Sequence, residues 1–200
     1  SILREHEAFF AAEREAARQL FGLTREGSGA ARARAAGQFV EVASGLLSRD
    51  KASALRGDVE AADRAVLLAR QIMEASLSHE GLDPRSAALA AESLEELRAA
   101  RMVDLSPYDE ELLFRRLQAS ARLGDEAEAE RLSDLLQERA LAGGGVFSKA
   151  GLGLMLQRAA AAWRAGPQDE ARARAMVKQG VRALASDWSG LSDAARLTVR

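Results

Sequence analysis

The stretch GGGVFSKAGLGLML, residues 143–156, holds residue types that could bind a phosphate, because clustered glycines lie beside a serine and a lysine. A P-loop needs the order G-x-x-x-x-G-K-[ST], in which backbone N–H groups surround the phosphate and the lysine reaches over it. Lys149 instead follows Ser148 and precedes Ala150, and the segment before the glycines has a helical pattern rather than a strand pattern. We therefore interpret the stretch as a joint between two helices.

The side chains that most often carry catalysis or bind metals are scarce. The only histidines are His6 and His79, and Phe10 stands where a zinc-binding HExxH motif requires its second histidine. The chain has no cysteine, which excludes disulfides, thiol catalysis and cysteine-ligated zinc. Short acidic runs lie beside arginines or in first helical turns, where carboxylates complement the helix dipole. We expect no catalytic residue, no metal and no cofactor, and a chain that is not an enzyme.

The charge balance bears on the partners of the chain. Its formal net charge is −2, whereas a surface that binds nucleic acid normally carries an excess of basic residues. The uncharged run near residues 151–156 is ended by Arg158, and the longest uncharged run of the chain has nine residues. This run is far shorter than the roughly 20 apolar residues of a transmembrane helix. We predict a protein or peptide partner, no nucleic acid, and no membrane insertion within this chain.

Other features concern the origin of the chain. It begins at Ser1 and ends within a helical pattern, so we expect a fragment of a longer protein. Arginine outnumbers lysine and alanine is abundant, which is typical of a GC-rich bacterial genome. The absence of cysteine fits any compartment, so the choice between cytoplasm and periplasm stays open.

The periodicity of the sequence predicts an all-α fold. Only 4% of the residues are aromatic, so the core must be built mainly from alanine, leucine and valine. Apolar residues recur at spacings of three and four, which is typical of amphipathic helices, and no run alternates with period two. Glycines and prolines divide the chain into helices predicted at 2–21, 30–56, 58–79, 85–102, 107–123, 126–142, 148–165, 168–186 and 190–200.

Three glycine turns can be aligned with one another: LRGDVEAADRA, RLGDEAEAERL and RAGPQDEARAR. In each, an alanine follows five positions after the glycine. Glycine can end a helix in a left-handed conformation, and the aspartate after the first two glycines can cap the next helix. The alanine one turn later allows the two helices to cross closely. The residues with this structural role are Gly57, Asp58, Ala62, Gly124, Asp125, Ala129, Gly166 and Ala171.

This pattern resembles the tetratricopeptide repeat (TPR), a helix–turn–helix unit with a Gly-Asp turn. The 67 residues from Gly57 to Gly124 are close to two periods of about 34. The family's first-helix glycine is absent, however, and Asp50 stands in its place in the first repeat. The resemblance implies antiparallel helical hairpins stacked as a right-handed superhelix over residues 30–200, after an N-terminal helix and loop at 1–29.

The TPR resemblance also implies a noncatalytic scaffold that binds a partner in a concave groove. In the family's register the groove residues are Lys51, Glu111, Phe114, Gln118, Arg122, Trp163 and Arg164. Their arginines, glutamine and aromatic rings suit an extended acidic or carboxylate-bearing peptide. Alanine at Arg122 and Arg164 is expected to weaken binding without changing the thermal midpoint. The alternative is a helical domain of a regulator that senses a small molecule, which requires an enclosed apolar pocket.

Overall fold

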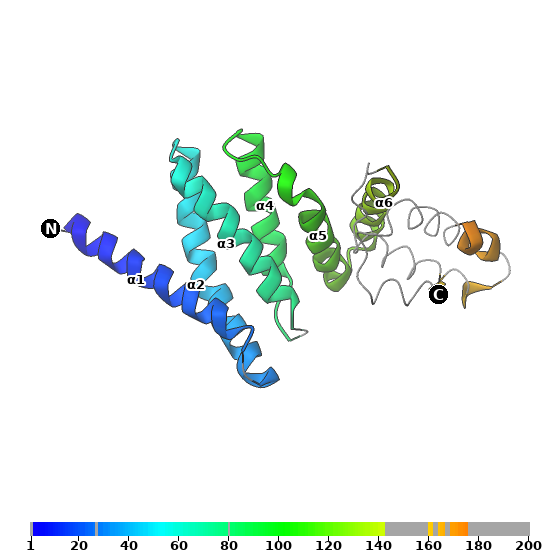
Figure 1. Ribbon diagram of the computed structural model, residues 1–200, viewed down its shortest axis with the longest axis horizontal. Helices are drawn as coiled ribbons and strands as arrows, with labels where there is room; N and C mark the ends of the chain where they lie inside the picture. The colour runs from blue at the N-terminus through cyan, green and yellow to red at the C-terminus, as the bar shows by residue number, and fades with distance from the viewer. Residues whose placement is uncertain are drawn as a thin grey trace, which may run out of the picture. The chain divides into compact units, whose positions relative to one another are not determined.

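A computed structural model describes residues 2–26, 28–79, 81–142, 160–161, 164–166 and 169–175. These residues form helices and connecting turns, with no strand among them, so the fold class is all-α (Figure 1). The chain divides into two compact units, Ser1–Asp125 and Glu126–Arg200, and each is described by itself. The predicted boundary between residues 29 and 30 stays a prediction, and the glycine-rich stretch 143–156 lies outside the described residues.

The helices lie close to where the sequence predicts them. The first unit contains α1 (Ile2–Leu23), α2 (Gly29–Leu55), α3 (Val59–Leu77), α4 (Arg85–Ala99), the 3-10 turn η1 (Ser106–Tyr108) and α5 (Asp109–Leu123). The second unit begins with α6 (Glu126–Ala142), and its residues 169–175 are also helical. The six helices predicted between residues 2 and 142 are confirmed. The helices predicted at 148–165, 168–186 and 190–200 lie partly or wholly outside the described residues.

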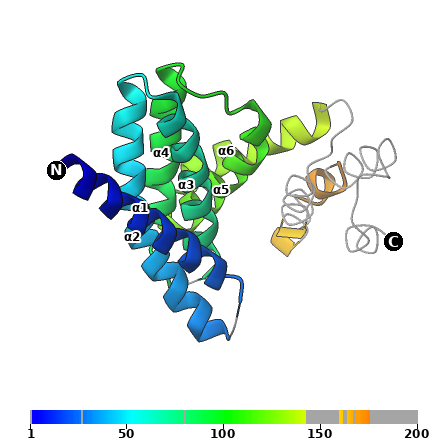
Figure 2. The ribbon, with the colours of Figure 1, turned by 60° about the vertical axis from the view of Figure 1, so that its left-hand side comes forward.

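Successive helices of the first unit run antiparallel and pack on one another (Figure 1). In addition, α2 contacts α4 and α3 contacts α5, although neither pair is adjacent in the sequence. The helices α2 and α4 therefore form one layer and α3 and α5 form the other (Figure 2). The result is two antiparallel pairs, α2/α3 and α4/α5, that lie side by side, with α1 packed against α2.

Alanine allows this close packing. Four alanines on one side of α3, Ala61, Ala62, Ala65 and Ala69, are completely buried. Their spacing follows the helical period, so they form a stripe along α3 toward the core. Because an alanine side chain ends at Cβ, helices that meet through such a stripe approach at the short end of the usual range of about 8–10 Å between axes.

The predicted glycine turns have positive φ angles: 102° at Gly57, 74° at Gly124 and 119° at Gly166. At Gly57, the backbone N–H of Gly57 donates to Ala54 (2.8 Å) and that of Asp58 donates to Ser53 (3.2 Å). This pair of hydrogen bonds is the Schellman closure of a helix.

The residues after the glycines differ in their surroundings. The carboxylate of Asp58 accepts a hydrogen bond from the backbone N–H of Ala61 and caps α3. At Gly124, the N–H of Asp125 donates to Ser120 across the end of α5. Of the three predicted alanines, Ala62 is buried, whereas Ala129 is half-buried and Ala171 is exposed.

The end of α4 has the same closure without a glycine. Arg101 has a φ of 58°, its N–H donates to Arg98 (2.9 Å), and the N–H of Met102 donates to Leu97 (2.9 Å). The sequence search missed this turn because an arginine occupies the position that favours glycine. The turn explains why the helix predicted at 85–102 ends at Ala99.

The order of the helices places the turns at Gly57 and Gly124 differently. Three α-helices, α3, α4 and α5, lie between Gly57 and Gly124, so these turns lie at opposite ends of the helix layers (Figure 1). Two equivalent turns of a two-helix repeat would lie at the same end. The turn that matches Gly57 is instead at Arg101, 44 residues later, where α4 leads toward α5.

The two matched turns predict opposite effects of substitution. Arg101→Gly is expected to raise the free energy of unfolding by about 1 kcal/mol, because glycine adopts the left-handed conformation without the steric cost that other residues pay. Gly57→Ala is expected to lower it by a similar amount for the same reason. Urea unfolding followed by circular dichroism measures both. Effects of the same sign would contradict the conformational origin of the two turns.

Candidate functional site

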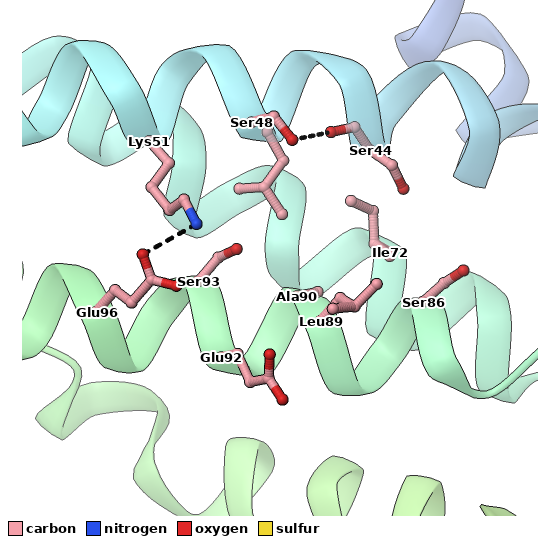
Figure 3. A pocket seen from close by; sticks show the side chains of 11 residues that line it. Ser44, Ser48, Lys51, Ile72, Ser86, Leu89, Ala90, Glu92, Ser93 and Glu96 are labelled. Atoms are coloured by element: carbon pink, nitrogen blue, oxygen red, sulfur yellow. Dashed lines mark hydrogen bonds and ion pairs between the residues drawn. The ribbon is translucent and has the colours of Figure 1, made fainter.

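A groove lies between α2 and α4 in the first unit. It consists of two cavities of about 230 and 300 Å³, which share Ser44 and Ser86 in their linings (Figure 3). Leu47 and Ile72 lie in the lining of the first cavity, and Ser76 of α3 lies in the lining of the second. We call this feature the α2–α4 groove.

The two walls of the groove have matching residue spacings. Along each helix, wall positions follow the pattern i, i+3, i+7 and i+10, which places them on one helical face. Each wall position on α2 has a counterpart on α4 that lies 45 residues later. The wall residues are Glu41, Ser44, Ser48 and Lys51 on α2 and Ser86, Leu89, Ser93 and Glu96 on α4.

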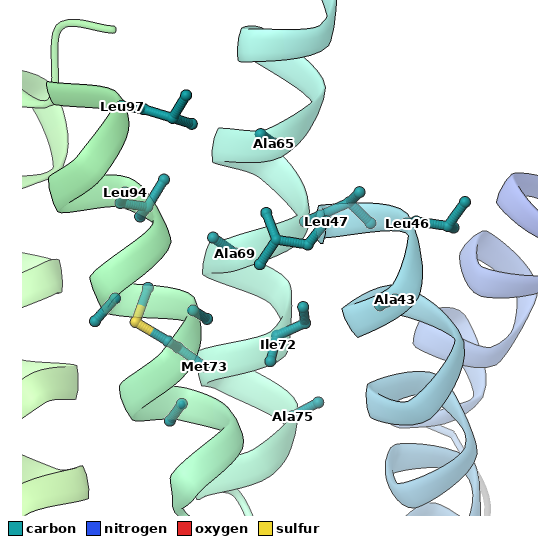
Figure 4. Close-up of a cluster of buried hydrophobic side chains, with 14 of the residues drawn as sticks. Ala43, Leu46, Leu47, Ala65, Ala69, Ile72, Met73, Ala75, Leu94 and Leu97 are labelled. Atoms are coloured by element: carbon teal, nitrogen blue, oxygen red, sulfur yellow. The ribbon is translucent and has the colours of Figure 1, made fainter. Parts of the chain in front are cut away.

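Below the groove, α3 determines the spacing between the walls. Ile72 and Met73 are almost completely buried, and they belong to one cluster with Leu47 of α2 and Leu94 and Leu97 of α4 (Figure 4). A tightly packed core of this kind resists changes of volume. The distance between α2 and α4 is therefore fixed by the side chains of α3.

Serine hydroxyls open into the groove. Ser48 donates to the backbone oxygen of Ser44 (3.1 Å). The hydroxyls of Ser44, Ser86 and Ser93 make no hydrogen bond with any other residue that the structure describes. Ser93 is only 9% exposed, yet its oxygen points into the groove (Figure 3). The hydroxyl oxygen itself stays open to the groove, so it can still form a hydrogen bond.

Carboxylates dominate the charge of the groove. Its charged lining residues are Glu41, Asp83, Glu92 and Glu96 on the negative side and Lys51 on the positive side. Lys51 is paired with Glu96, with 3.0 Å between Nζ and Oε2. Glu41 and Glu92 form no ion pair or hydrogen bond within the described part of the chain, and both are exposed.

A buried ion cluster holds α2 in position behind the groove. The carboxylate of Asp50, with a side chain 3% exposed, accepts two hydrogen bonds from Arg14 of α1 (2.6 and 2.7 Å) and one from Arg64 of α3 (3.3 Å). The guanidinium of Arg49 lies over the ring of Phe10. Desolvation there, together with the charge of Arg14, lowers the pKa of Arg49.

The groove residues predicted from the TPR register lie on two helices of the first unit and in the second unit. Lys51 lies in the α2–α4 groove, whereas Glu111, Phe114, Gln118 and Arg122 lie on α5 and are half-buried. Glu111 accepts a hydrogen bond from Arg70 of α3 at 2.7 Å, and Gln118 accepts one from Arg115. In the second unit, Arg164 is exposed, and Trp163 lies outside the described residues.

Arg122 holds α5 against the end of α3. Its Nη2 donates to the backbone oxygen of His79 (2.8 Å) and its Nη1 donates to that of Ser76 (3.4 Å). These carbonyls lie at the C-terminal end of α3, where positive charge is favoured by the helix dipole. These contacts give Arg122 a structural role. Removal of its side chain is therefore expected to lower the thermal midpoint, whereas the sequence had suggested no change.

We predict that Arg122→Ala lowers the free energy of unfolding by about 1 kcal/mol, since hydrogen bonds from a charged donor are lost. Thermal unfolding of the variant measures the effect as a lower midpoint. Arg164→Ala is the matched control, because Arg164 is exposed in the second unit, and it should leave the midpoint unchanged. Equal midpoints for the two variants would show that Arg122 does not hold α3 and α5 together.

The groove serines are the functional feature that sequence reasoning missed. Serine is not specific for any chemistry. The repeat pattern was derived from the glycine turns, and it does not include the helix faces between them. A signal was nevertheless present, because Ser44 and Ser48 share one face of a predicted helix, as do Ser86 and Ser93. The pattern on the two helices becomes informative only once α2 and α4 are known to be neighbours.

The described part of the chain contains neither a metal-binding cluster nor a membrane-spanning helix. Among the described residues, no three histidine, aspartate or glutamate side chains are grouped so that they could hold a metal ion. None of the helices in the described part of the chain combines the length and apolar character needed to cross a membrane. Comparison of the chain with models of protein families, with curated proteins and with solved structures finds no match.

Proposed function

We propose that the first unit is a noncatalytic scaffold, and that its α2–α4 groove binds an extended segment of a partner protein. In this proposal, α2/α3 and α4/α5 are two units of a helical-hairpin repeat stacked as a TPR-like α-solenoid. The α2–α4 and α3–α5 contacts support the stacking, and the turns at Gly57 and Arg101, which each follow the first helix of a pair, support the equivalence of the hairpins. The 44-residue spacing exceeds the TPR period of about 34 and falls among longer helical repeats.

The position and the lining of the α2–α4 groove support peptide binding. It lies between the first helices of both hairpins, the position from which stacked helical repeats present a continuous binding surface. Leu89, 62% exposed, offers an apolar contact in the middle of the groove, and the surrounding hydroxyls offer hydrogen bonds to a peptide backbone. A row of apolar and hydrogen-bonding sites suits an extended peptide.

The alternative, a sensor of a small molecule, receives less support. Pockets for such ligands are typically enclosed, apolar and roughly 300–1,000 Å³ in volume. The two cavities of the groove are about 230 and 300 Å³, and their rims include the exposed residues Ser48, Leu89 and Glu96. These features fit a segment that crosses the surface better than an enclosed molecule.

A peptide-binding assay tests the proposed function. Fluorescein-labelled, amidated hexapeptide pools that together cover basic, acidic and neutral sequences are titrated with the whole chain, and fluorescence anisotropy reports binding. We expect at least one pool to bind. Leu89→Gln should weaken that binding about tenfold, because it removes the exposed apolar contact from the groove.

Leu67→Gln is the matched control. Leu67 is an exposed leucine of α3, 53% exposed, and it does not line the groove. Both substitutions replace an exposed side chain, so both variants should keep the circular dichroism spectrum and thermal midpoint of the original chain. If no pool binds, or if the two variants weaken binding equally, the α2–α4 groove is not the binding surface.

A further inference from the structure

We propose that the segment bound in the α2–α4 groove is a basic peptide of about six residues, with lysine or arginine side chains that reach the carboxylates of the groove. This inference rests on the proposed function and names the chemistry of its partner. It differs from the acidic peptide that the sequence suggested, because carboxylates outnumber basic side chains in the lining of the groove.

The charged side chains that line the groove favour a basic peptide. Four carboxylates and a single ammonium group line the two cavities, and the ammonium of Lys51 is already paired with Glu96. Glu41 and Glu92 have no ionic partner among the described residues, and they line different cavities of the groove: Glu41 lines the second cavity from α2, and Glu92 lines the first from α4, with its carboxylate directed away from α2 (Figure 3). A basic segment that crosses both cavities can pair with both, whereas an acidic segment would face uncompensated repulsion.

The serine hydroxyls of the groove are a second, independent reason to expect a peptide. The residue Ser93 is 9% exposed, and its Oγ, which is open to the groove, has no hydrogen-bond partner among the described residues (Figure 3). Ser44 and Ser86 add two more unpartnered hydroxyls where the two cavities meet. A hydroxyl can both donate and accept, so such a row can pair with the backbone of an extended peptide whatever its side chains are.

The length of the groove sets the size of the segment. The lining residues on α2 run from Gly37 to Lys51, and a helix rises about 1.5 Å per residue, so the groove is about 21 Å long. An extended peptide advances about 3.3 Å per residue, which gives about six residues. The ion pair between Lys51 and Glu96 lies at one end of this path, and Leu82 lies at the other.

The experiment compares three hexapeptide pools that differ only in charge. Each pool is fluorescein-labelled and amidated and contains alanine, serine and leucine, together with lysine and arginine, with aspartate and glutamate, or with asparagine and glutamine. We expect the whole chain to bind the basic pool most tightly. The double substitution Glu41→Gln, Glu92→Gln should weaken that binding about fivefold, and added salt should weaken it further.

The control for charge is Glu5→Gln, Glu7→Gln, which removes two exposed carboxylates of α1 and should leave binding unchanged. Ser93→Ala should weaken the binding of whichever pools bind by a similar factor, since its hydroxyl is expected to pair with the peptide backbone.

The outcomes separate this inference from the proposed function. If the acidic or neutral pool binds most tightly and Leu89→Gln weakens that binding, the groove binds peptides but the basic partner is wrong. If the basic pool binds and the double glutamine variant binds it equally well, the assigned carboxylates are wrong. If no pool binds, the inference and the proposed function both fail.

Discussion

Asp50→Ala is expected to destabilise the first unit by about 3 kcal/mol. Removal of one partner from a buried ion cluster leaves the others without compensation, which typically costs about 3–5 kcal/mol. Here Arg14 and Arg64 keep about a third of their side-chain surface exposed, at 31% and 38%, so both can turn toward water and the lower end of that range applies. The free energy of unfolding in urea measures the loss.

Two comparisons make the Asp50 prediction specific. Arg14→Ala should cost less than Asp50→Ala, because Asp50 then keeps its hydrogen bond from Arg64. Glu15→Ala removes a carboxylate of an exposed pair on α1 and should leave stability unchanged. A loss below about 1 kcal/mol for Asp50→Ala would show that the cluster does not hold α1, α2 and α3 together.

Ala69→Leu is expected to destabilise the first unit by about 2–3 kcal/mol. Ala69 of α3 is completely buried where α3 packs against its neighbouring helices. The longer leucine side chain would have to displace atoms that are already packed there (Figure 4). Because α3 determines the distance between α2 and α4, the same substitution should also weaken peptide binding. Urea unfolding and the hexapeptide assay measure the two effects on one sample.

The control places the same side chain where space is free. Ala52 lies on an exposed face of α2, so Ala52→Leu should change stability by less than about 0.5 kcal/mol. If Ala69→Leu were as harmless as Ala52→Leu, the alanine stripe of α3 would not control how closely the helices pack.

The helices were predictable because their signals are local. A spacing of three and four between apolar residues, as in Val59, Ala62, Val66 and Ala69, depends only on the segment itself. The turn at Gly57 was predictable for the same reason, since glycine is the residue that most readily adopts its positive φ. At Arg101 the same backbone conformation is imposed without glycine, and the sequence alone did not reveal it.

The candidate site could not be predicted, because it depends on which helices become neighbours. The TPR register treated Gly124 as the equivalent of Gly57 and so placed four of the seven groove residues on α5. In the structure the turn after α4 is at Arg101, and the wall opposite α2 is formed by α4. Asp50 gives a second example: it stands where the family has a glycine, and its role becomes visible only with Arg14 and Arg64 beside it.

The most direct test of the account is to map the bound peptide on the protein. The whole chain, labelled with ¹⁵N, is titrated with the basic hexapeptide pool, and the amide signals are followed by NMR. We expect the largest shifts at residues 41–51 of α2 and 86–96 of α4, with smaller shifts on α5. Largest shifts on α5, at Glu111, Phe114, Gln118 and Arg122, or no shifts at all, would contradict the assignment of the α2–α4 groove as the binding site.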